Sequence, residues 1–461
     1  MNNHMNNPSN EKSGQAIKRR RFIQLSAIGS ALGPGLGLVS PKAFAATPSA
    51  AAANPPNGST SSPVPLDPEI EELLKTKNPY KRVLTPSAEH GTNYHAKTKP
   101  WTLTAEEVKA VGLDRDSYSL EIVLKDGESQ GAFLDQPRTI AAGNAITHAD
   151  LVRLMEQRPV KFLKTMVCTN GPFYGSALWE GVALRDVLWL AKPRGAIRRI
   201  TFFSPDLADM TKVQWRTSRS TSQVFENPPG LPPPFLALKF NGDWLPLLNG
   251  GPVRLIVPEN YGTENIKYLR KIVISHDDEV LDSETTLTGG NDMETPMKSC
   301  AMKFVNLGKN EKVPHDKPLV LIGIAQTGEA SLRMGQIAIV PAPPGSTETA
   351  NTPPGDDPYL DKLPWKDAAI LPPPADLATQ IPGGTKGVHG FDPTSGKPLI
   401  WPIPFFYCYF AAVFRDLTPG SYLAYYRSID RNGIAQPLPR PFGGKTGVND
   451  QLFHPTLFEV I

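Results

Sequence analysis

Residues 164–188 read KTMVCTNGPFYGSALWEGVALRDVL, and this stretch indicates both the fold and the chemistry of the chain. The apolar run from Phe162 to Val167 predicts a strand that delivers Cys168 into a loop of Gly, Asn and Pro residues. A turn at Trp179–Gly181 and a short apolar helix are expected next. A thiolate in a polar loop can be a soft metal ligand or a nucleophile, whereas a thiol used only for packing more often lies in an unbroken apolar run.

The N-terminus has the pattern of an export signal. Adjacent arginines at 19–21 precede a weakly apolar, Gly-rich stretch, and Ala43-Phe44-Ala45 offers small residues for cleavage. This order predicts a twin-arginine signal peptide over 1–45, followed by a flexible linker over 46–66. A periplasmic location follows as an expectation. No stretch reaches the roughly 18 apolar residues of a membrane span, so none is expected.

Charge and cysteine content limit the partners and cofactors that the chain can have. The net charge is +3, and residues 1–45 hold six cationic residues and one anionic residue, so the rest of the chain is near −2. No basic run indicates nucleic acid as a partner. With three cysteines, Cys300 and Cys408 can pair and leave Cys168 free, but the sequence does not decide this. No Cys-x-x-Cys-His motif or cysteine cluster predicts a c-type haem or an iron–sulfur cluster.

The periodicity predicts an α+β domain over 67–300 and a β-sandwich over 301–461. The first part mixes short helices with strands, whereas the second shows spaced strands without long helices. A Pro/Gly-rich insertion with little periodicity is expected over 342–400. The expected strands are 118–125, 199–203, 235–240, 244–248, 253–257, 272–275, 318–325, 336–340, 405–414, 421–426 and 456–461, and a helix turn is expected at 150–157.

Three segments together resemble the sulfite oxidase family of molybdopterin enzymes. They are the Cys168 stretch, residues 238–272 with LKFNGDWLPLLNGGPVRLIVP followed by GTENIKYLRKI, and residues 419–437, PGSYLAYYRSIDRNGIAQP. The first two are similar to the family's cofactor domain and the third to its immunoglobulin-like dimerisation domain. The resemblance implies a bound molybdenum–molybdopterin cofactor and a homodimer.

The resemblance also implies which residues bind the cofactor. Cys168 matches the cysteine thiolate that ligates molybdenum. Pro252-Val253-Arg254 and Ile266-Lys267-Tyr268 match the positions that bind the phosphate of the pterin, and the charges suit this because Arg can clamp a phosphate and Lys adds a point charge. The same residues can also be ordinary strand-edge charges. The expected cofactor-binding set is Asn93, Tyr94, Cys168, Asn170, Asn249, Arg254, Asn265 and Lys267.

The substrate is less well indicated. The family's sulfite-binding Arg-Asn-His has no clear counterpart, and the nearest candidates are Glu89-His90-Gly91 and Asn93-Tyr94-His95. Trp215 stands where the family has a tyrosine near the substrate. Arg216 is expected to bind an anion, and His90 or His95 to handle protons.

Three functions remain open. The first is an exported oxidoreductase that oxidises sulfite or a related small oxyanion and passes electrons to a separate carrier, expected to be a c-type cytochrome. The second is an S-oxide or N-oxide reductase, favoured by Asn93-Tyr94 and by the short loop after Cys168. The third is a secreted, non-catalytic binding protein on a degenerate enzyme fold.

Overall fold

The computed structural model describes residues 64–77, 79–91, 98–128, 131–168, 171–206, 209–226, 230–280, 282–283, 299–346, 360–436 and 455–461. Residues 61–461 form one compact unit, and the fold below is that of this unit. The expected signal peptide and residues 46–63 of the expected linker lie outside the described residues. Within the described part, no helix is long and apolar enough to cross a membrane.

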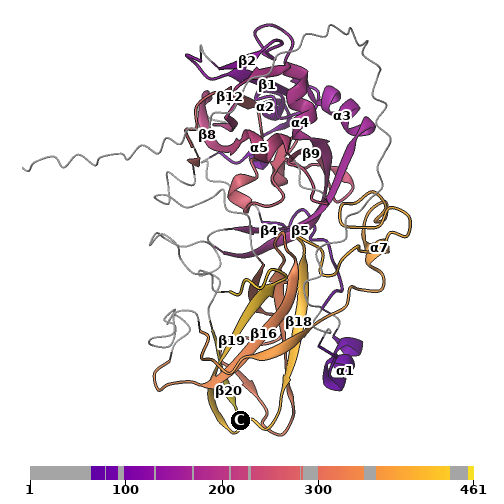
Figure 1. Ribbon diagram of the computed structural model, residues 1–461, viewed down its shortest axis with the longest axis vertical. Coiled ribbons are helices and arrows are strands. Elements are labelled where there is room, and N and C mark those ends of the chain that lie inside the picture. Colours follow the sequence, from indigo (N-terminus) through magenta and orange to yellow (C-terminus); the bar gives the residue numbers. More distant parts are fainter. Residues whose placement is uncertain are drawn as a thin grey trace, which may run out of the picture. The chain divides into compact units, whose positions relative to one another are not determined.

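A mixed sheet of five strands begins the α+β part (Figure 1). Its order is β3-β1-β12-β7-β8, with β1 parallel to β12 and β12 antiparallel to β7. Side chains alternate along a strand, so Leu120 and Ile122 of β1 and Ile272 and Ile274 of β12 enter one core and are fully buried. The strands are β1 (Ser119–Leu124), β3 (Ile146–Thr147), β7 (Arg199–Asp206), β8 (Asp209–Ser220) and β12 (Lys271–Ser275).

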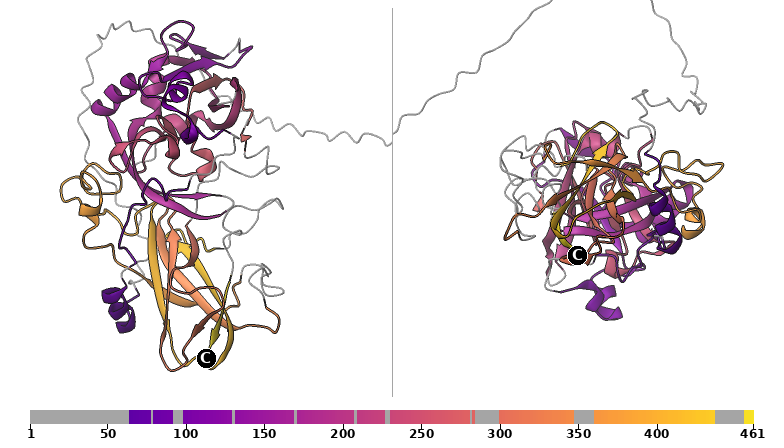
Figure 2. Two further views of the ribbon diagram at one scale, coloured as in Figure 1. Left: turned by 180° about the vertical axis from the view of Figure 1, so that it is seen from behind. Right: turned by 90° about the horizontal axis from the view of Figure 1, so that it is seen from below.

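A second sheet carries the cysteine stretch. Its order is β10-β9-β5-β4, and β11 also pairs with β9. The long antiparallel β4–β5 hairpin is the magenta ribbon of Figure 1, seen from behind in Figure 2. The strands are β4 (Pro159–Cys168), β5 (Gly171–Ala183), β9 (Phe235–Phe240), β10 (Asp243–Trp244) and β11 (Arg254–Ile256), and β2 (Ala132–Leu134) pairs separately with β6 (Pro193–Gly195).

Short helices connect these strands. Helix α3 begins with a capping box between Thr147 and Asp150, and it buries Leu151 and Met155. The α-helices are α1 (Pro68–Thr76), α2 (Ala105–Ala110), α3 (His148–Gln157), α4 (Leu184–Leu188), α5 (Thr221–Phe225) and α7 (Leu377–Gln380). The 3₁₀ helices are η1 (Pro100–Thr102), η2 (Trp189–Ala191), η3 (Leu247–Asn249) and η4 (Gly262–Glu264).

The C-terminal part is an eight-stranded sheet around its own core. Its order is β13-β15-β18-β17-β16-β19-β20-β14, and β13 also packs across β19. Buried side chains from both halves, such as Leu321, Ile337, Phe410 and Tyr426, form one cluster. The strands are β13 (Cys300–Phe304), β14 (Glu311–Val313), β15 (Leu319–Gln326), β16 (Leu332–Pro341), β17 (Lys366–Ile370), β18 (Tyr407–Phe414), β19 (Gly420–Asp430) and β20 (Thr456–Val460).

Several predictions of local structure were wrong. The expected loop and turn after Cys168 are strand β5, because Trp179 to Val182 pair with both β4 and β9. The second arm of the 235–248 hairpin is only the two-residue β10, followed by helix η3. Residues 366–370, inside the expected Pro/Gly-rich insertion, form β17 between β16 and β18.

Cys300 and Cys408 are both buried and form no disulfide with each other, so the pairing left open by the sequence is not present. Strand β15 lies between their strands β13 and β18. In addition, burial raises the pKa of the Cys408 thiol well above its usual range. Cys408 therefore packs the core as a small apolar side chain, whereas the Cys300 Sγ also accepts from Gln436 Nε2 at 3.4 Å.

Phe410 offers a test of the C-terminal core. Its ring lies over Gly323 of β15 and Gly335 of β16, where an added Cβ would come within 2.2 Å and 2.4 Å of the ring. We expect Phe410→Ala to lower the free energy of unfolding by about 3–5 kcal/mol, because it leaves a cavity between the strands. Phe133→Ala is the control, since Phe133 is 39% exposed. Equal denaturant midpoints for the two variants would contradict this packing.

Candidate functional site

Cys168 ends β4 beside the loop of residues 257–265. It pairs with Gly171 of β5, and only residues 169 and 170 connect the two strands. A Cβ on Gly262 would lie 3.4 Å from the carbonyl oxygen of Val167, so the loop passes next to the end of β4. The side chain of Cys168 and the whole of Asn170 lie outside the described part. Their expected roles therefore remain predictions.

Arg254, at the start of β11, is a buried cation and is only 4% exposed. Its Nε donates to the carbonyl of Asn265 at 3.2 Å, and its Nη1 donates to that of Asn249 at 2.8 Å. The guanidinium carbon lies 5.1 Å from the ring centroid of Trp179. No carboxylate of the described residues lies within ion-pair distance, and burial lowers the pKa of Arg254 to about 10. A buried cation without an opposite charge suits an anionic ligand.

Lys267 lies near Arg254, and these two residues with His90, Trp179 and Asn249 form a buried cluster, the candidate pocket. Burial lowers its pKa well below the usual value, and the positive charges of Arg254 and Lys99 lower it further. Gly250 makes the approach of Lys267 feasible, because its φ is 103° and a Cβ there would lie 2.7 Å from the Lys267 Cγ. The pocket thus holds two cations that repel each other, and a bound anion would relieve this repulsion.

Asn249 supports the pocket from helix η3. Its side chain is fully buried, and the Ser87 hydroxyl donates to its Oδ1. Its Nδ2 donates to the Ser87 carbonyl at 3.3 Å, while its own carbonyl accepts from Arg254. Asn249 therefore links the segment before His90 to the guanidinium of Arg254.

His90 reaches the same pocket from the N-terminal segment. Thr85 fixes this segment to β5, because its N–H donates to the Ser176 carbonyl at 2.7 Å and its hydroxyl accepts from the Ser176 N–H at 3.0 Å. The His90 ring is 1% exposed and lies edge-on to Trp179, with centroids 5.7 Å apart. Among the described residues, neither ring nitrogen of His90 nor Nε1 of Trp179 has a hydrogen-bond partner. These atoms are available to a ligand.

Burial lowers the pKa of His90 to about 3, and Arg254 and Lys267 add to this shift. The ring is therefore neutral near pH 7. A neutral imidazole in this position can donate or accept a hydrogen bond. This environment favours ligand binding over the proton transfer near neutral pH that the sequence suggested for His90.

Asn265 stabilises the loop of residues 257–265 through hydrogen bonds to other residues of that loop. Its Oδ1 accepts from the Val257 N–H at 2.9 Å, and its Nδ2 donates to the Tyr261 carbonyl at 2.5 Å. Its main-chain carbonyl accepts from Arg254. Asn265 thus closes the loop and helps to hold Arg254, which places it next to the candidate pocket.

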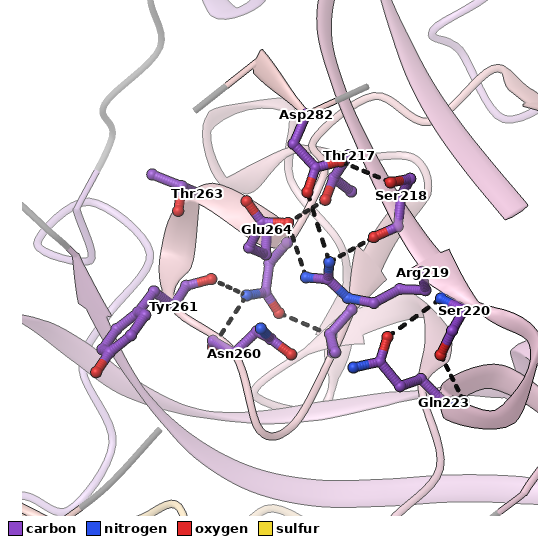
Figure 3. Close-up of polar contacts among 12 residues, drawn as sticks. Thr217, Ser218, Arg219, Ser220, Gln223, Asn260, Tyr261, Thr263, Glu264 and Asp282 are labelled. Carbon is purple, nitrogen blue, oxygen red and sulfur yellow. Dashed lines mark hydrogen bonds and ion pairs between the residues drawn. The ribbon is translucent and has the colours of Figure 1, made fainter. Parts of the chain in front are cut away.

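Strand β8 turns one face toward this loop (Figure 3). Trp215 donates from Nε1 to the Thr263 carbonyl at 3.0 Å, and the Thr217 hydroxyl donates to Glu264. Arg219 pairs with Glu264 at 2.7 Å, and both side chains are buried. Arg219 and Glu264 were not singled out from the sequence, although the two-residue period from Trp215 places Arg219 on the same face.

Arg216 is placed differently from Trp215. It lies between Trp215 and Thr217 on the strand, so its side chain leaves the opposite face of β8. Its main-chain N–H donates to the Ser283 hydroxyl at 3.0 Å, and its side chain is half-buried. The structure therefore brings Trp215 to the loop at Thr263 but does not place Arg216 on that face.

Arg219 lies between two buried carboxylates. Besides Glu264, the Asp282 carboxylate is 3.9 Å away and accepts from the Ser218 hydroxyl at 2.8 Å. Burial, followed by the negative charge of Glu264, raises the pKa of Asp282 to about 6. The charge of Arg219 is thus balanced within the protein, whereas that of Arg254 is not.

Asn93, Tyr94 and His95 lie outside the described residues. Their expected contributions to cofactor binding and proton handling stay predictions. Of the N-terminal candidates, Glu89, His90 and Gly91 are described, and Glu89 pairs with Arg82.

The residues that are described fit a molybdopterin cofactor, which is anionic and rich in hydrogen-bonding groups. Arg254 and Lys267 would bind its phosphate end, and the ring nitrogens of His90 and Nε1 of Trp179 could meet its polar edges. Gly250 lets the backbone come close. These features all lie beside β4, the strand that ends at Cys168.

Comparisons with known proteins agree with this reading of the pocket. Residues 143–281 match the family described as oxidoreductase molybdopterin binding domain. The chain is 32% identical over 139 residues to an NADPH nitrate reductase of Fusarium oxysporum, covering 30% of this chain and 14% of that protein. It is 27% identical over 232 residues to the mitochondrial sulfite oxidase of Macaca fascicularis, covering 48% of this chain and 40% of that protein.

A solved structure, the sulfane dehydrogenase SoxCD from Paracoccus pantotrophus, is similar with a TM-score of 0.49 and 17% identity. The match covers 89% of this chain and 96% of that chain. The chain spans less than half the length of the curated relatives it matches.

The domain match agrees with the buried cationic pocket, because residues 143–281 are similar to an oxidoreductase molybdopterin binding domain. The similarity to mitochondrial sulfite oxidases extends over 48% of the chain, and the matched domain implies a molybdenum cofactor.

The contrast between Arg254 and Arg219 gives a test of the pocket. We expect Arg254→Met to remove most of the stabilisation that the cofactor gives, which is about 2.7 kcal/mol for a ligand at a hundred times its Kd. Arg219→Met should lower the stability of the cofactor-free protein by about 3–5 kcal/mol, because it leaves Glu264 buried without its partner. Unfolding curves of loaded and cofactor-free protein separate the two effects. Full cofactor stabilisation in Arg254→Met would show that the pocket is assigned wrongly.

The pKa of His90 predicts a pH dependence. Its folded-state pKa of about 3 is below the unfolded value of 6.5, so its contribution is fully present above pH 6.5. As the pH falls from 6.5 toward 3, the unfolded chain takes up a proton that the folded protein does not, and up to about 1.4 kcal/mol is lost per pH unit. His90→Asn should weaken this dependence in urea unfolding of the cofactor-free protein. Parallel pH profiles for the two proteins would refute the shifted pKa.

Proposed function

We propose that the chain is an exported molybdenum enzyme that oxidises sulfite or a related small sulfur oxyanion and passes the electrons to a separate carrier. The observation that carries this is the pocket of Arg254, Lys267 and His90, which has buried positive charge and unused hydrogen-bonding atoms beside the Cys168 strand. The bound cofactor would supply two-electron oxygen-atom transfer. The similarity to sulfite oxidases, which extends over 232 residues, supports a sulfur oxyanion as substrate.

The residues of this chain would contribute in separate ways. Arg254 and Lys267 would bind the anionic part of the cofactor, and Asn249 and Asn265 would hold Arg254 through their carbonyls. Cys168 would ligate the metal. Trp215, fixed to Thr263, would border the substrate position, whereas Arg216 leaves the opposite face of β8, so the anion binding expected of it would lie away from that position.

Assembly, location and electron transfer belong to the same proposal. The C-terminal sheet would be an immunoglobulin-like domain through which two chains associate, as its resemblance to the family's dimerisation domain suggests. The signal-like N-terminus supports a periplasmic location. The sequence has no haem-attachment motif, so a separate cytochrome c would accept the electrons.

Reduction of an S-oxide or N-oxide is the second candidate. The segment from Cys168 to Trp179 is short, which resembles the family's reductase-like branch. The similarity to nitrate reductases adds nitrate to the substrates that need testing.

The first test is molybdenum per chain, measured by elemental mass spectrometry on protein exported by a host that makes the cofactor. We expect near-stoichiometric metal in the native protein and at least a tenfold loss in Cys168→Ser, because a soft thiolate ligand is replaced by a hydroxyl. Loaded protein should then reduce ferricyanide with sulfite. Turnover only with reduced viologen and an S-oxide, N-oxide or nitrate would establish the second candidate. Folded, exported protein without metal would indicate a non-catalytic binding protein.

A further inference from the structure

Lys164 is a buried cation that none of the expected roles uses. It lies on β4, four residues before Cys168, and its side chain is fully buried. It has no ion-pair partner within the part of the chain that the structure describes. A lysine is seldom buried in this way, because an ammonium group loses its hydration, and some specific contact must compensate.

The compensation comes from the backbone of the loop that follows β11. The Lys164 ammonium donates to the carbonyls of Val257 at 3.0 Å, Pro258 at 2.5 Å and Asn260 at 2.8 Å. Three acceptors need three N–H donors, which a lysine supplies only as the ammonium. Burial lowers the pKa of Lys164 well below its usual value, and the negative charge of Glu259 in the same loop opposes this.

The three carbonyls belong to the loop that borders the cofactor pocket. Arg254 precedes this loop and Lys267 follows it. Asn265 closes the loop from the inside through the Val257 N–H and the Tyr261 carbonyl. Lys164 hydrogen-bonds the same turn from β4. It therefore joins the turn to the strand that ends at Cys168.

We propose that Lys164 is a positioning residue that fixes the distance between the Cys168 strand and the loop that orients Arg254 and Lys267. The cofactor would need the metal ligand on one side and the cations on the other at a set spacing, and Lys164 is a direct polar link between the two. The proposal rests on cofactor binding in the proposed function and not on the substrate.

Lys164→Met tests this role, because it keeps the length of the side chain but removes the donors. Outer contacts that orient ligands typically change affinity by 10–100-fold, so we expect the cofactor to bind at least tenfold more weakly. At full occupancy, the electronic absorption of the metal–thiolate centre should also shift, since the thiolate is held less well. If Lys164 acted only through its positive charge, Lys164→Met would weaken cofactor binding without shifting the absorption of the metal–thiolate centre.

Lys161→Met is the matched control on the same strand. Lys161 pairs with Glu180 at 3.1 Å, and that carboxylate is 9% exposed, so its loss also costs stability. It does not touch the 257–260 turn in the described contacts. We expect cofactor affinity within about twofold of the native protein. Equal losses of affinity in both variants, or native affinity or an unshifted spectrum in Lys164→Met, would overturn the proposal.

Hydrogen exchange on the native, cofactor-free chain gives a second measurement, which holds even where Lys164→Met does not fold. A link through three hydrogen bonds should make residues 160–167 and 257–265 open together, with the same free energy of opening. Independent opening of the two segments would also overturn the proposal. Neither readout uses a substrate, so failure of sulfite turnover leaves the result unaffected.

Discussion

The burial of positive charge beside the Cys168 strand is the constraint on which the rest of the site depends. Three buried cations lie in or around the 257–265 loop, and each is compensated differently. Arg219 has the carboxylate of Glu264. Lys164 has three main-chain carbonyls. Arg254 has two carbonyls and an aromatic face, which leaves its charge unbalanced. The charge of Arg219 is balanced by a carboxylate, the three donors of the Lys164 ammonium are all hydrogen-bonded, and a bound anion would balance the charge of Arg254.

This difference explains why the loop has its conformation before any ligand is considered. Lys164 and Asn265 hydrogen-bond the carbonyls of Val257, Pro258, Asn260 and Tyr261, so contacts within the protein already hold this turn. The guanidinium of Arg254 is anchored by hydrogen bonds to the carbonyls of Asn249, which precedes it in the chain, and of Asn265, which follows it. A cation fixed in this way loses little entropy when an anion binds, which favours affinity.

The sequence predicted most strands whose side chains alternate, and it predicted Arg254 and Lys267 through their resemblance to a phosphate-binding pattern. It did not predict β5, because a strand covered on both faces has no alternation and Gly171-Pro172 resembles a loop. The sequence also predicted Arg216, and not Arg219, as the arginine of the site. The choice between neighbouring arginines depends on the register of β8, and only the pairing with β7 fixes that register.

His90 shows a further limit of sequence reasoning. A histidine near a predicted active site suggests proton transfer, because its ordinary pKa is close to neutral. The environment reverses this expectation, since burial against Trp179 and Phe240 and the nearby cations all disfavour the imidazolium. None of these neighbours is adjacent to His90 in sequence. Burial is the main reason that His90 is neutral, and the same buried cations that prepare the pocket for an anion add to this effect.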